Sequence, residues 1–478
     1  MRSWVSAALI LAAPVAAQGP DQATIARRVD SLVAARQAAL GLPAVAVAVV
    51  HPLGTVHEMA VGEARDGVPM TAETPILIGS VSKPITATLV MQLVDAGRVA
   101  LNAPVQRYLP WFRLADSAHA ATITVRQLLQ HRSGIPTRAG LRRLGTTTLD
   151  SAVASLRSLP TEPPGSSFAY SNANYHILGA LLEAMTDSSY AELVEARLLR
   201  PLRMTGSGTD TAGATLADGH RLWFGIPRAA APAFNPALLP AGNLVSTARD
   251  LGRFVRMTLA MGTLDGVGVL SLDGAIEMSA FDSGGTYALG WGWRRVDTFP
   301  ALGHSGALDV YQTELILVPS APIGVALVTT TTGMFTQTAI RRLALDVTRI
   351  AVGLDPLPDP AWSPRLIWRL ILLGALALAF TWGRQLWRLP RWRDELRAAR
   401  TATGMPYPRK QVVSAVWDLA MVAAVPLGIA AFAGVTLPTL LVVQRDVGLL
   451  VIAGMVVSAI LGVMKAYWLV TRDTRQGT

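Results

Sequence analysis

The sequence of 478 residues contains no cysteine, which excludes disulfide bonds, cysteine-ligated metals and thiol catalysis. Charged residues make up only 15% of the chain, whereas ordinary soluble domains contain about 25%. Hydrophobic residues make up 51%, so a disordered or low-complexity protein is excluded and a membrane component is favoured. At about 150 residues per domain, the length predicts two or three domains.

Lysine is nearly absent as well. Only Lys83, Lys410 and Lys465 occur among the 42 basic residues. Residues 1–360 hold 28 basic and 27 acidic residues, whereas residues 361–478 hold 14 and 5. The net charge of +10 therefore lies almost wholly in the C-terminal quarter, beside very apolar segments. That arrangement is typical of membrane topology and not of a nucleic-acid-binding face, so we expect a lipid bilayer and no nucleic acid as a partner.

Apolar segments at the two ends of the chain predict export and membrane insertion. Residues 1–17 have one basic residue, a short apolar core and small residues at Val15 and Ala17, as a Sec-type signal peptide does. A buried N-terminal helix is the alternative. Residues 365–478 contain three apolar runs that are long enough to span a bilayer. Eight basic residues in the segment 383–412 place that segment inside the cell by the positive-inside rule.

The intervening chain, residues 18–353, is expected to form one exported domain on the periplasmic side of a bacterial cytoplasmic membrane. Residues 354–364 read LDPLPDPAWSP, and proline at this density predicts a semi-rigid linker to the membrane region. Strand-like runs occur at both ends of the exported domain, and helical periodicity fills its middle. We therefore predict an α/β fold in which the two ends build one antiparallel sheet flanked by helices, beside an all-helical lobe.

Ser80 and Lys83 form the first motif that carries chemistry. The sequence Ser80-Val81-Ser82-Lys83 opens a predicted helix, so the two side chains lie on one face, one turn apart. Serine becomes a nucleophile when a base takes its proton, and a lysine amine can do so once burial and the helix N-terminus favour its neutral form. Lys83 is the sole lysine of the first 360 residues, and arginine cannot replace it because a guanidinium stays protonated. An arginine-favouring genome explains the rarity of lysine but not its position here.

Tyr170-Ser171-Asn172 opens another predicted helix. A phenol near a lysine ammonium can exist as phenolate and relay a proton. The Asn172 amide can hold the lysine amine or a substrate carbonyl. The alternative is that Ser171 or Asn172 merely caps the helix.

His304-Ser305-Gly306 lies on a predicted strand, where Gly306 lets a substrate backbone approach closely. The N–H of Ala307 would complete an oxyanion-binding pair with the N–H of Ser80. The alternative for His304 is a half-exposed strand histidine. The seven histidines lack metal-ligand spacing, so neither a metal nor another cofactor is expected.

Together the motifs resemble the serine penicillin-recognising family of class C β-lactamases, DD-carboxypeptidases and related esterases. The matching segments, spread over about residues 25–350, are IGSVSKPITA (78–87), ITVRQLLQHRSGIP (123–136), PGSSFAYSNANYHILGALLE (164–183), LLRPLRMTGSGTD (198–210), PAGNLVSTARDLGRF (240–254) and ALGHSG (301–306). The resemblance implies that Ser80 is acylated and that Lys83 accepts its proton. It implies that Tyr170 relays protons and serves in deacylation, that Asn172 positions groups and that His304 occupies the third motif.

One departure from the family bears on the substrate. Class C β-lactamases are expected to carry Lys-Thr-Gly where this chain has His-Ser-Gly. A histidine is mostly neutral at pH 7, so efficient β-lactam hydrolysis is disfavoured while acylation chemistry is unaffected. We therefore predict a membrane-anchored serine hydrolase acting on a D-amino-acid peptide, amide or ester, including peptidoglycan-like substrates. The alternatives are a β-lactamase, a sensor acylated by penicillin or a cell-wall fragment without fast turnover, and a transporter with an accessory domain.

Overall fold

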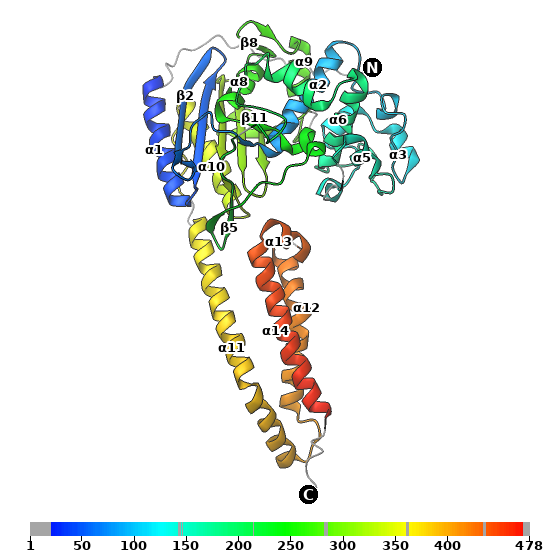
Figure 1. Ribbon diagram of the computed structural model, residues 1–478, viewed down its shortest axis with the longest axis vertical. Coiled ribbons are helices and arrows are strands. Elements are labelled where there is room, and N and C mark those ends of the chain that lie inside the picture. Colours follow the sequence, from blue (N-terminus) through cyan, green and yellow to red (C-terminus); the bar gives the residue numbers. More distant parts are fainter. Residues whose placement is uncertain are drawn as a thin grey trace.

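The computed structural model describes residues 21–141, 145, 147–213, 215–281, 285–359, 363–433 and 436–471. Figure 1 shows them as two parts, which we call the N-terminal domain (residues 21–359) and the C-terminal helices (residues 363–471). The domain of sheet and helices lies above, and the long helices extend below it. The predicted signal peptide over residues 1–17 lies outside the described residues.

The N-terminal domain is built on a seven-stranded antiparallel sheet with the order β10-β11-β12-β13-β1-β2-β3. Val47 lies opposite Leu327 where β1 pairs with β13, so the two ends of the domain meet inside the sheet, as predicted. The run AVAVAVV of β1 alternates: Ala46 and Ala48 face one core cluster, and Val47 and Val49 face the other. The strands are β1 (Ala44–His51), β2 (Gly54–Arg65), β3 (Val68–Pro69), β10 (Gly292–Val296), β11 (Phe299–Ala307), β12 (Gln312–Val318) and β13 (Ile323–Thr329).

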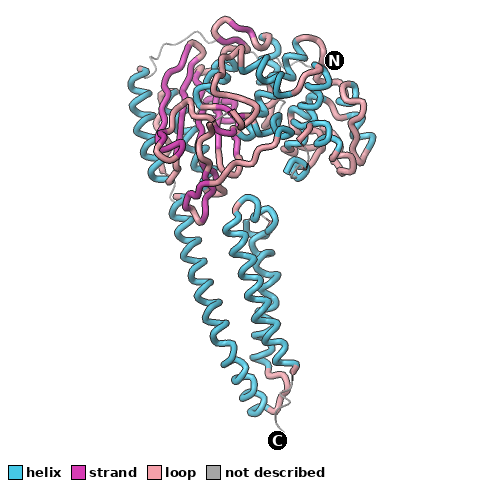
Figure 2. Tube along the Cα trace, in the orientation of Figure 1, coloured by secondary structure: helices cyan, strands magenta, loops and turns pink. Residues whose placement is uncertain are grey.

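Helices cover both faces of this sheet. α1 (Gln22–Leu40) and α10 (Thr336–Ala351) pack on the valine side of β1, and α8 (Ala248–Leu259) packs on the alanine side. The small side chains allow a close approach, because a Cβ on Gly252 of α8 would lie only 3.3 Å from Ala48. Figure 2 shows the strands in magenta, with α1 on one side and most other helices of the domain on the other.

A lobe of mostly short helices adjoins the alanine side and holds two of the predicted motifs. The helix predicted from Ser80 begins at Ser82 and is preceded by a 3₁₀ turn, η1 (Gly79–Val81). The helices are α2 (Ser82–Asp95), α3 (Ser117–Thr122), α4 (Val125–Leu129), α5 (Leu149–Ala154), α6 (Asn172–Thr186), α7 (Tyr190–Val194) and α9 (Leu272–Ser279). Further short turns are η2 (Val105–Arg107), η3 (Thr137–Leu141), η4 (Glu195–Leu199), η5 (Pro236–Leu238) and η6 (Leu239–Asn243).

Three small sheets complete the described part of the domain. They pair β4 (Ile76–Leu77) with β7 (Val245–Ser246), β8 (Thr263–Leu264) with β9 (Val267–Gly268), and β5 (His220–Trp223) with both β6 (Ile226–Ala229) and β14 (Thr331–Thr332). The β4–β7 pair matters most for the site, because β4 leads directly into the turn that carries Ser80.

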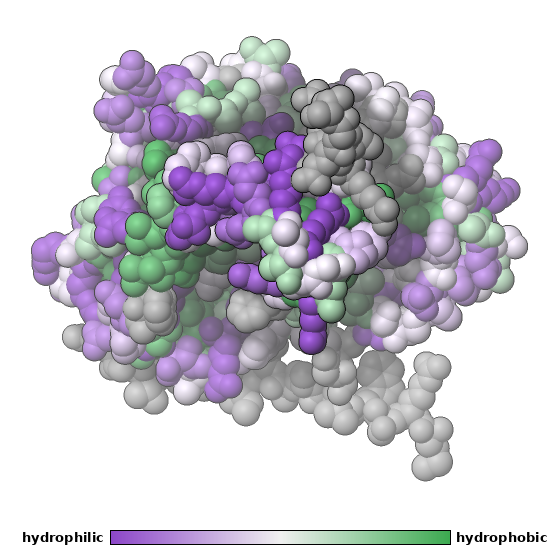
Figure 3. All heavy atoms as spheres, turned by 90° about the horizontal axis from the view of Figure 1, so that it is seen from below, coloured by the Kyte–Doolittle hydropathy of each residue, from purple (hydrophilic) through white to green (hydrophobic). Residues whose placement is uncertain are grey.

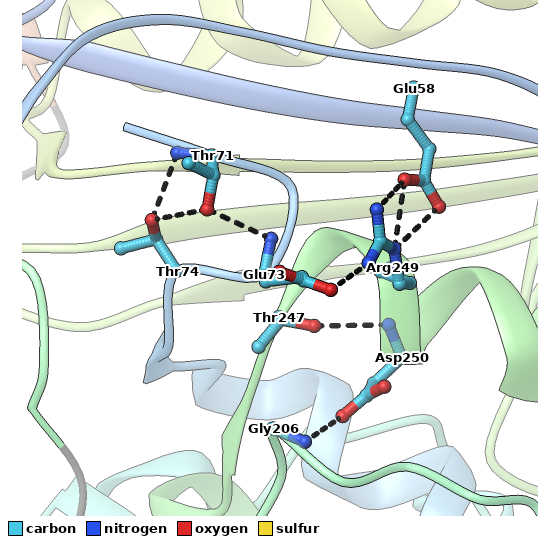
Figure 4. A network of polar contacts seen from close by, with 8 residues as sticks. All are labelled: Glu58, Thr71, Glu73, Thr74, Gly206, Thr247, Arg249 and Asp250. Carbon is cyan, nitrogen blue, oxygen red and sulfur yellow. Dashed lines mark hydrogen bonds and ion pairs between the residues drawn. The ribbon is translucent and has the colours of Figure 1, made fainter. Parts of the chain in front are cut away.

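A polar network fixes the chain just before β4 (Figure 4). Arg249, at the start of α8, contacts both oxygens of Glu58 on β2, the shorter distance being 2.6 Å, and also pairs with Glu73. The next residue, Asp250, accepts the N–H of Gly206 at 2.8 Å. These contacts join the sheet edge, α8 and two loops, so the segment entering β4 has a fixed position.

The described part of the predicted proline linker, residues 354–359, forms two ion pairs with α1. The Asp355 carboxylate lies 2.6 Å from the Arg28 guanidinium, and Asp359 pairs with Arg36. Residues 354–359 therefore lie against α1, and α11 begins at Pro364.

Three of the described helices are long and apolar enough to cross a membrane, namely α11, α12 and α14. Figure 3 looks at the molecule from below and shows hydrophilic residues gathered at the near ends of the helices. The basic segment 383–412 is helical as far as Thr403, because α11 continues until Gly404 adopts a left-handed conformation. The elements are α11 (Pro364–Thr403), α12 (Arg409–Ala433), α13 (Leu437–Val443) and α14 (Arg445–Val470).

An ion pair joins α12 to α14. Lys465 Nζ lies 2.6 Å from Asp418 Oδ2 and 2.9 Å from Ser414 Oγ, and both charged side chains are about nine-tenths buried. Ionisable groups in apolar helices are stable when they are paired in this way. The pair therefore accounts for Asp418 within an otherwise apolar segment.

Candidate active site

Ser80 lies on a tight turn between β4 and α2. Gly79 has a φ of +55°, a left-handed conformation that glycine adopts readily. The hydroxyl of Ser82 donates to the Gly79 carbonyl at 2.9 Å and accepts the N–H of Leu244 at 3.3 Å. These bonds hold the turn that presents the Ser80 side chain to Lys83.

Lys83 is completely buried, and its amine has three oxygen neighbours. Nζ lies 3.0 Å from Ser80 Oγ, 2.7 Å from Asn172 Oδ1 and 2.6 Å from the carbonyl oxygen of Ala241. The π-helical turn η6 supplies the Ala241 carbonyl. Burial lowers the pKa of Lys83 well below that of an ordinary lysine, which favours the neutral amine.

These three neighbours fit a neutral amine that is ready to take a proton from serine. A neutral amine has two N–H groups and one lone pair. Asn172 Oδ1 and the Ala241 carbonyl are acceptors only, so they take the two N–H groups. The Asn172 amide is held in this orientation because its Nδ2 donates to the Gly140 carbonyl at 3.2 Å. The lone pair of Lys83 is then left for the hydroxyl proton of Ser80.

Tyr170 lies close to the Ser80–Lys83 pair. Lys83 Nζ is 4.9 Å from the centre of the Tyr170 ring, and the nearby Ser80 side chain partly offsets the effect of burial on the pKa of Tyr170. Burial raises the pKa of Tyr170 above that of an ordinary tyrosine. The resting side chain is therefore a neutral phenol, which disfavours the phenolate expected from sequence. A neutral phenol in this position can still pass a proton between Ser80 and a leaving group.

His304 is buried, unlike the half-exposed strand histidine that was its alternative. Its Nδ1 lies 3.0 Å from the carbonyl oxygen of Ser305, so Nδ1 carries the proton. Nε2 is then an acceptor and takes the hydroxyl of Tyr287 at 2.8 Å. Burial, together with the positive charge of nearby Arg294, lowers the pKa of His304 well below its usual value. The third motif therefore presents a neutral imidazole.

Ser305 has a partner inside the protein. Its hydroxyl donates to Glu314 Oε2 at 2.5 Å, and Gln312 Nε2 donates to the other carboxylate oxygen at 2.7 Å. Burial raises the pKa of Glu314. Ser305 was predicted to help position a substrate, but its hydroxyl proton is already donated to Glu314.

The end of β11 passes directly against the turn that carries the serine. A Cβ on Gly306 would overlap the carbonyl oxygen of Ile78 and lie 3.1 Å from the backbone nitrogen of Ser80. Conversely, a Cβ on Gly79 would lie 2.8 Å from the backbone nitrogen of Ala307. This contact therefore requires glycine at both positions. The contact brings the two predicted oxyanion donors, the N–H groups of Ser80 and Ala307, close together.

Sequence reasoning missed His131 and Tyr287. The His131 ring lies 4.2 Å from that of Tyr170 and 4.9 Å from that of Tyr287, and its Nδ1 accepts the N–H of Ser171 at 3.2 Å. It also lies 3.1 Å from the amide nitrogen of Asn174. The sequence HRSG was a usable signal for His131, whereas Tyr287 stands in no motif. No cluster of metal-ligating side chains occurs among the described residues.

Comparison with known proteins identifies the family. Residues 29–348, well over half of the chain, match the family model described as Beta-lactamase. The chain belongs to the beta-lactamase family. Penicillin-binding protein 4 of Amycolatopsis lactamdurans is 34% identical over 299 residues, which cover 58% of this chain and 78% of that protein. The predicted resemblance is confirmed, and the match ends before the C-terminal helices begin.

Two solved structures share the fold of the N-terminal domain. The octameric penicillin-binding protein homologue from Pyrococcus abyssi aligns with a TM-score of 0.61 at 23% identity, over 69% of this chain and 78% of that one. D-amino acid amidase from Ochrobactrum anthropi SV3 aligns with a TM-score of 0.57 at 23% identity, over 67% and 98%. These likenesses confirm the predicted antiparallel sheet with flanking helices and a helical lobe.

Lys83→Arg is expected to reduce turnover of any accepted ester by at least about 10³-fold, because a guanidinium cannot accept the Ser80 proton. Parental activity should fall in acid as Lys83, or the coupled Lys83–Tyr170 pair, gains a proton. Since burial lowers the pKa of Lys83, this fall should occur at a lower pH than for an ordinary lysine. The pH–rate profile measures both effects. Lys410→Arg, at an exposed position, is the matched control, and near-parental turnover in Lys83→Arg would remove the general-base role.

Gly306→Ala is expected to reduce turnover by about 10²-fold, because its methyl group must push the end of β11 away from Ser80. Overpacking should also lower the free energy of unfolding by about 1–3 kcal/mol. Gly268→Ala is the matched control, since a Cβ there meets nothing within 4 Å. Ester turnover and thermal melting test both variants. Equal behaviour of the two would show that the contact between β11 and the serine turn is unimportant.

Proposed function

We propose that this chain is a membrane-anchored serine hydrolase that acts through an acyl-enzyme on D-amino-acid peptides, amides or esters outside the cytoplasm. The observation that carries the proposal is the arrangement of Lys83 Nζ among Ser80 Oγ, Asn172 Oδ1 and the Ala241 carbonyl. Two acceptors occupy the N–H groups of a neutral amine, and the third neighbour is the nucleophile.

The acylation step follows from this geometry. Lys83 takes the hydroxyl proton while Ser80 Oγ attacks the substrate carbonyl carbon. The N–H groups of Ser80 and Ala307 stabilise the resulting oxyanion. Lys83, now an ammonium, returns its proton through the Tyr170 hydroxyl to the leaving amine or alcohol, and the tetrahedral intermediate collapses to an ester on Ser80.

Deacylation reverses the direction of proton transfer. Tyr170 passes a proton of the attacking water to Lys83, and the hydroxide equivalent adds to the ester carbonyl. Collapse of the second tetrahedral intermediate releases the acid and returns the proton to Ser80 Oγ. No metal or cofactor takes part in this scheme.

The third motif favours peptide and ester substrates over β-lactams. His304 accepts the Tyr287 hydroxyl and is neutral, so it offers no permanent cation to a β-lactam carboxylate. The preference for D-amino-acid substrates rests on the relatives: one is titled a penicillin-binding protein and another a D-amino acid amidase. We therefore place amide, peptide and ester hydrolysis ahead of β-lactam hydrolysis.

Ser80→Ala is expected to abolish both turnover and covalent labelling by a fluorophosphonate or a fluorescent penicillin. The full chain in detergent is assayed with a short-chain nitrophenyl ester, a D-alanyl-D-alanine peptide, a D-amino-acid amide and a cephalosporin. Ser82→Ala is unsuitable as a control because Ser82 holds the turn, so Ser279→Ala on α9 is used. Labelling of a serine other than Ser80, located by peptide mass, contradicts the assignment. Stable labelling without turnover of any substrate would favour the sensor over the hydrolase.

The topology predicts which parts of the chain a protease can reach. With residues 18–353 outside and the basic segment 383–412 inside, protease added to spheroplasts should remove the N-terminal domain and spare the basic segment. Cleavage of both segments after lysis is the control. Protection of the N-terminal domain in intact spheroplasts would overturn the proposed orientation.

A further inference from the structure

A hairpin of the N-terminal domain rests between the upper ends of two C-terminal helices. The hairpin is made by β5 and β6, and Figure 1 shows β5 on the underside of the domain. At its turn, the Phe224 N–H donates to Asp446 Oδ2 of α14 at 2.5 Å. A Cβ on the next residue, Gly225, would lie within 2.7 Å of Trp368 on α11. The turn therefore lies level with the first turns of both helices.

One face of this hairpin carries two arginines directly opposite each other. The register pairs Arg221 with Arg228 and Trp223 with Ile226, so all four side chains share a face. Like charges in this position repel each other. Arg221 lies 3.1 Å from Asp309, whereas Arg228 has no acidic partner among the described residues. Trp223 and Ile226 are 41% and 51% exposed.

Together with α14 this face lines a pocket of about 250 Å³. The helix contributes Arg445, whose side chain is exposed, and Leu449 one turn further along. Within the described part of the chain no carboxylate pairs with Arg445. The adjacent Asp446 is buried, accepts from Phe224 N–H and Gln444 Nε2, and forms no ion pair with an arginine of the pocket in the described part of the chain.

We propose that this pocket binds the phosphate of an anionic phospholipid headgroup in the outer leaflet, an inference that rests on the proposed membrane anchoring. Guanidinium groups match phosphate oxygens through paired N–H donors, and an anion relieves the repulsion between Arg221 and Arg228. The pocket lies where α14 begins, which is the depth of the headgroup layer. Trp223 fits the same layer because an indole ring is amphipathic, and Leu449 faces the acyl chain.

The mixed lining of the pocket favours a lipid over free phosphate. Three arginines supply the anion-binding part, and Trp223, Leu449 and two alanines supply an apolar part beside it. A free inorganic phosphate gains nothing from contact with that apolar part, whereas a phospholipid presents phosphate and hydrocarbon together.

The test measures binding of phosphatidylglycerol to the full chain in detergent by native mass spectrometry. Arg228→Gln combined with Arg445→Gln removes the two arginines that lack acidic partners, and should raise the Kd for this lipid at least about tenfold. Arg157→Gln combined with Arg200→Gln removes two exposed arginines of the helical lobe and should leave the Kd unchanged. Phosphatidylcholine should bind more weakly than phosphatidylglycerol to the parental protein, and inorganic phosphate should not displace the lipid.

Three results would overturn the proposal: an unchanged Kd in the Arg228 and Arg445 variant, equal binding of the two lipids, or displacement of the lipid by inorganic phosphate. Two further measurements separate such a failure from failure of the proposed function. Both variants should remain in carbonate-washed membranes and keep parental ester turnover, because neither changes the candidate active site. Loss of the parental protein from washed membranes would remove the anchoring itself, while ester turnover reports the hydrolase independently.

Discussion

Burial of the Lys83 amine is the constraint on which the site depends. An amine in an apolar interior favours its neutral form, but its N–H groups still require acceptors. The carbonyl of Ala241 is one of them, and its position is fixed from the same helix that carries the lysine. Thr86, one turn along α2, donates to the Pro240 carbonyl at 2.7 Å, and the Tyr190 hydroxyl lies 2.7 Å from the same Thr86 oxygen. The helix thus supplies both the base and the support for the turn that orients it.

The burial that prepares Lys83 to act as a base lowers the stability of the fold. Folding lowers the pKa of Lys83. At pH values between the folded pKa and the unfolded pKa of about 10.4, the unfolded chain therefore binds more protons than the folded chain. The free energy of unfolding therefore rises with pH through this window, and the neutral amine is destabilising at neutral pH. An apolar residue at this position would stabilise the core better than a buried lysine does. The site is retained at the expense of stability, which is a pattern expected of functional groups.

The local motifs of the site were predictable, and its long-range contacts were not. Ser80 and Lys83 are three residues apart, so helix geometry alone brings them together. The apolar run AVAVAVV likewise indicated a strand, which is β1 in the structure. By contrast, the contact of Lys83 with Ala241 joins residues 158 positions apart, and a backbone carbonyl leaves no signature in a sequence. Tyr287 reaches His304 only because β11 and the loop before β10 meet in the folded chain.

The hairpin that meets the C-terminal helices is also tied to the strand end that carries Ala307. Arg221 on β5 pairs with Asp309, which lies two residues beyond Ala307. Just before β5, the carbonyl of Ala217 accepts the Tyr311 hydroxyl at 2.6 Å. The turn that follows the candidate oxyanion donor is thus held by the same segment that rests on α11 and α14. The position of the domain on α11 and α14 and the geometry at the end of β11 therefore depend on contacts of the same segment.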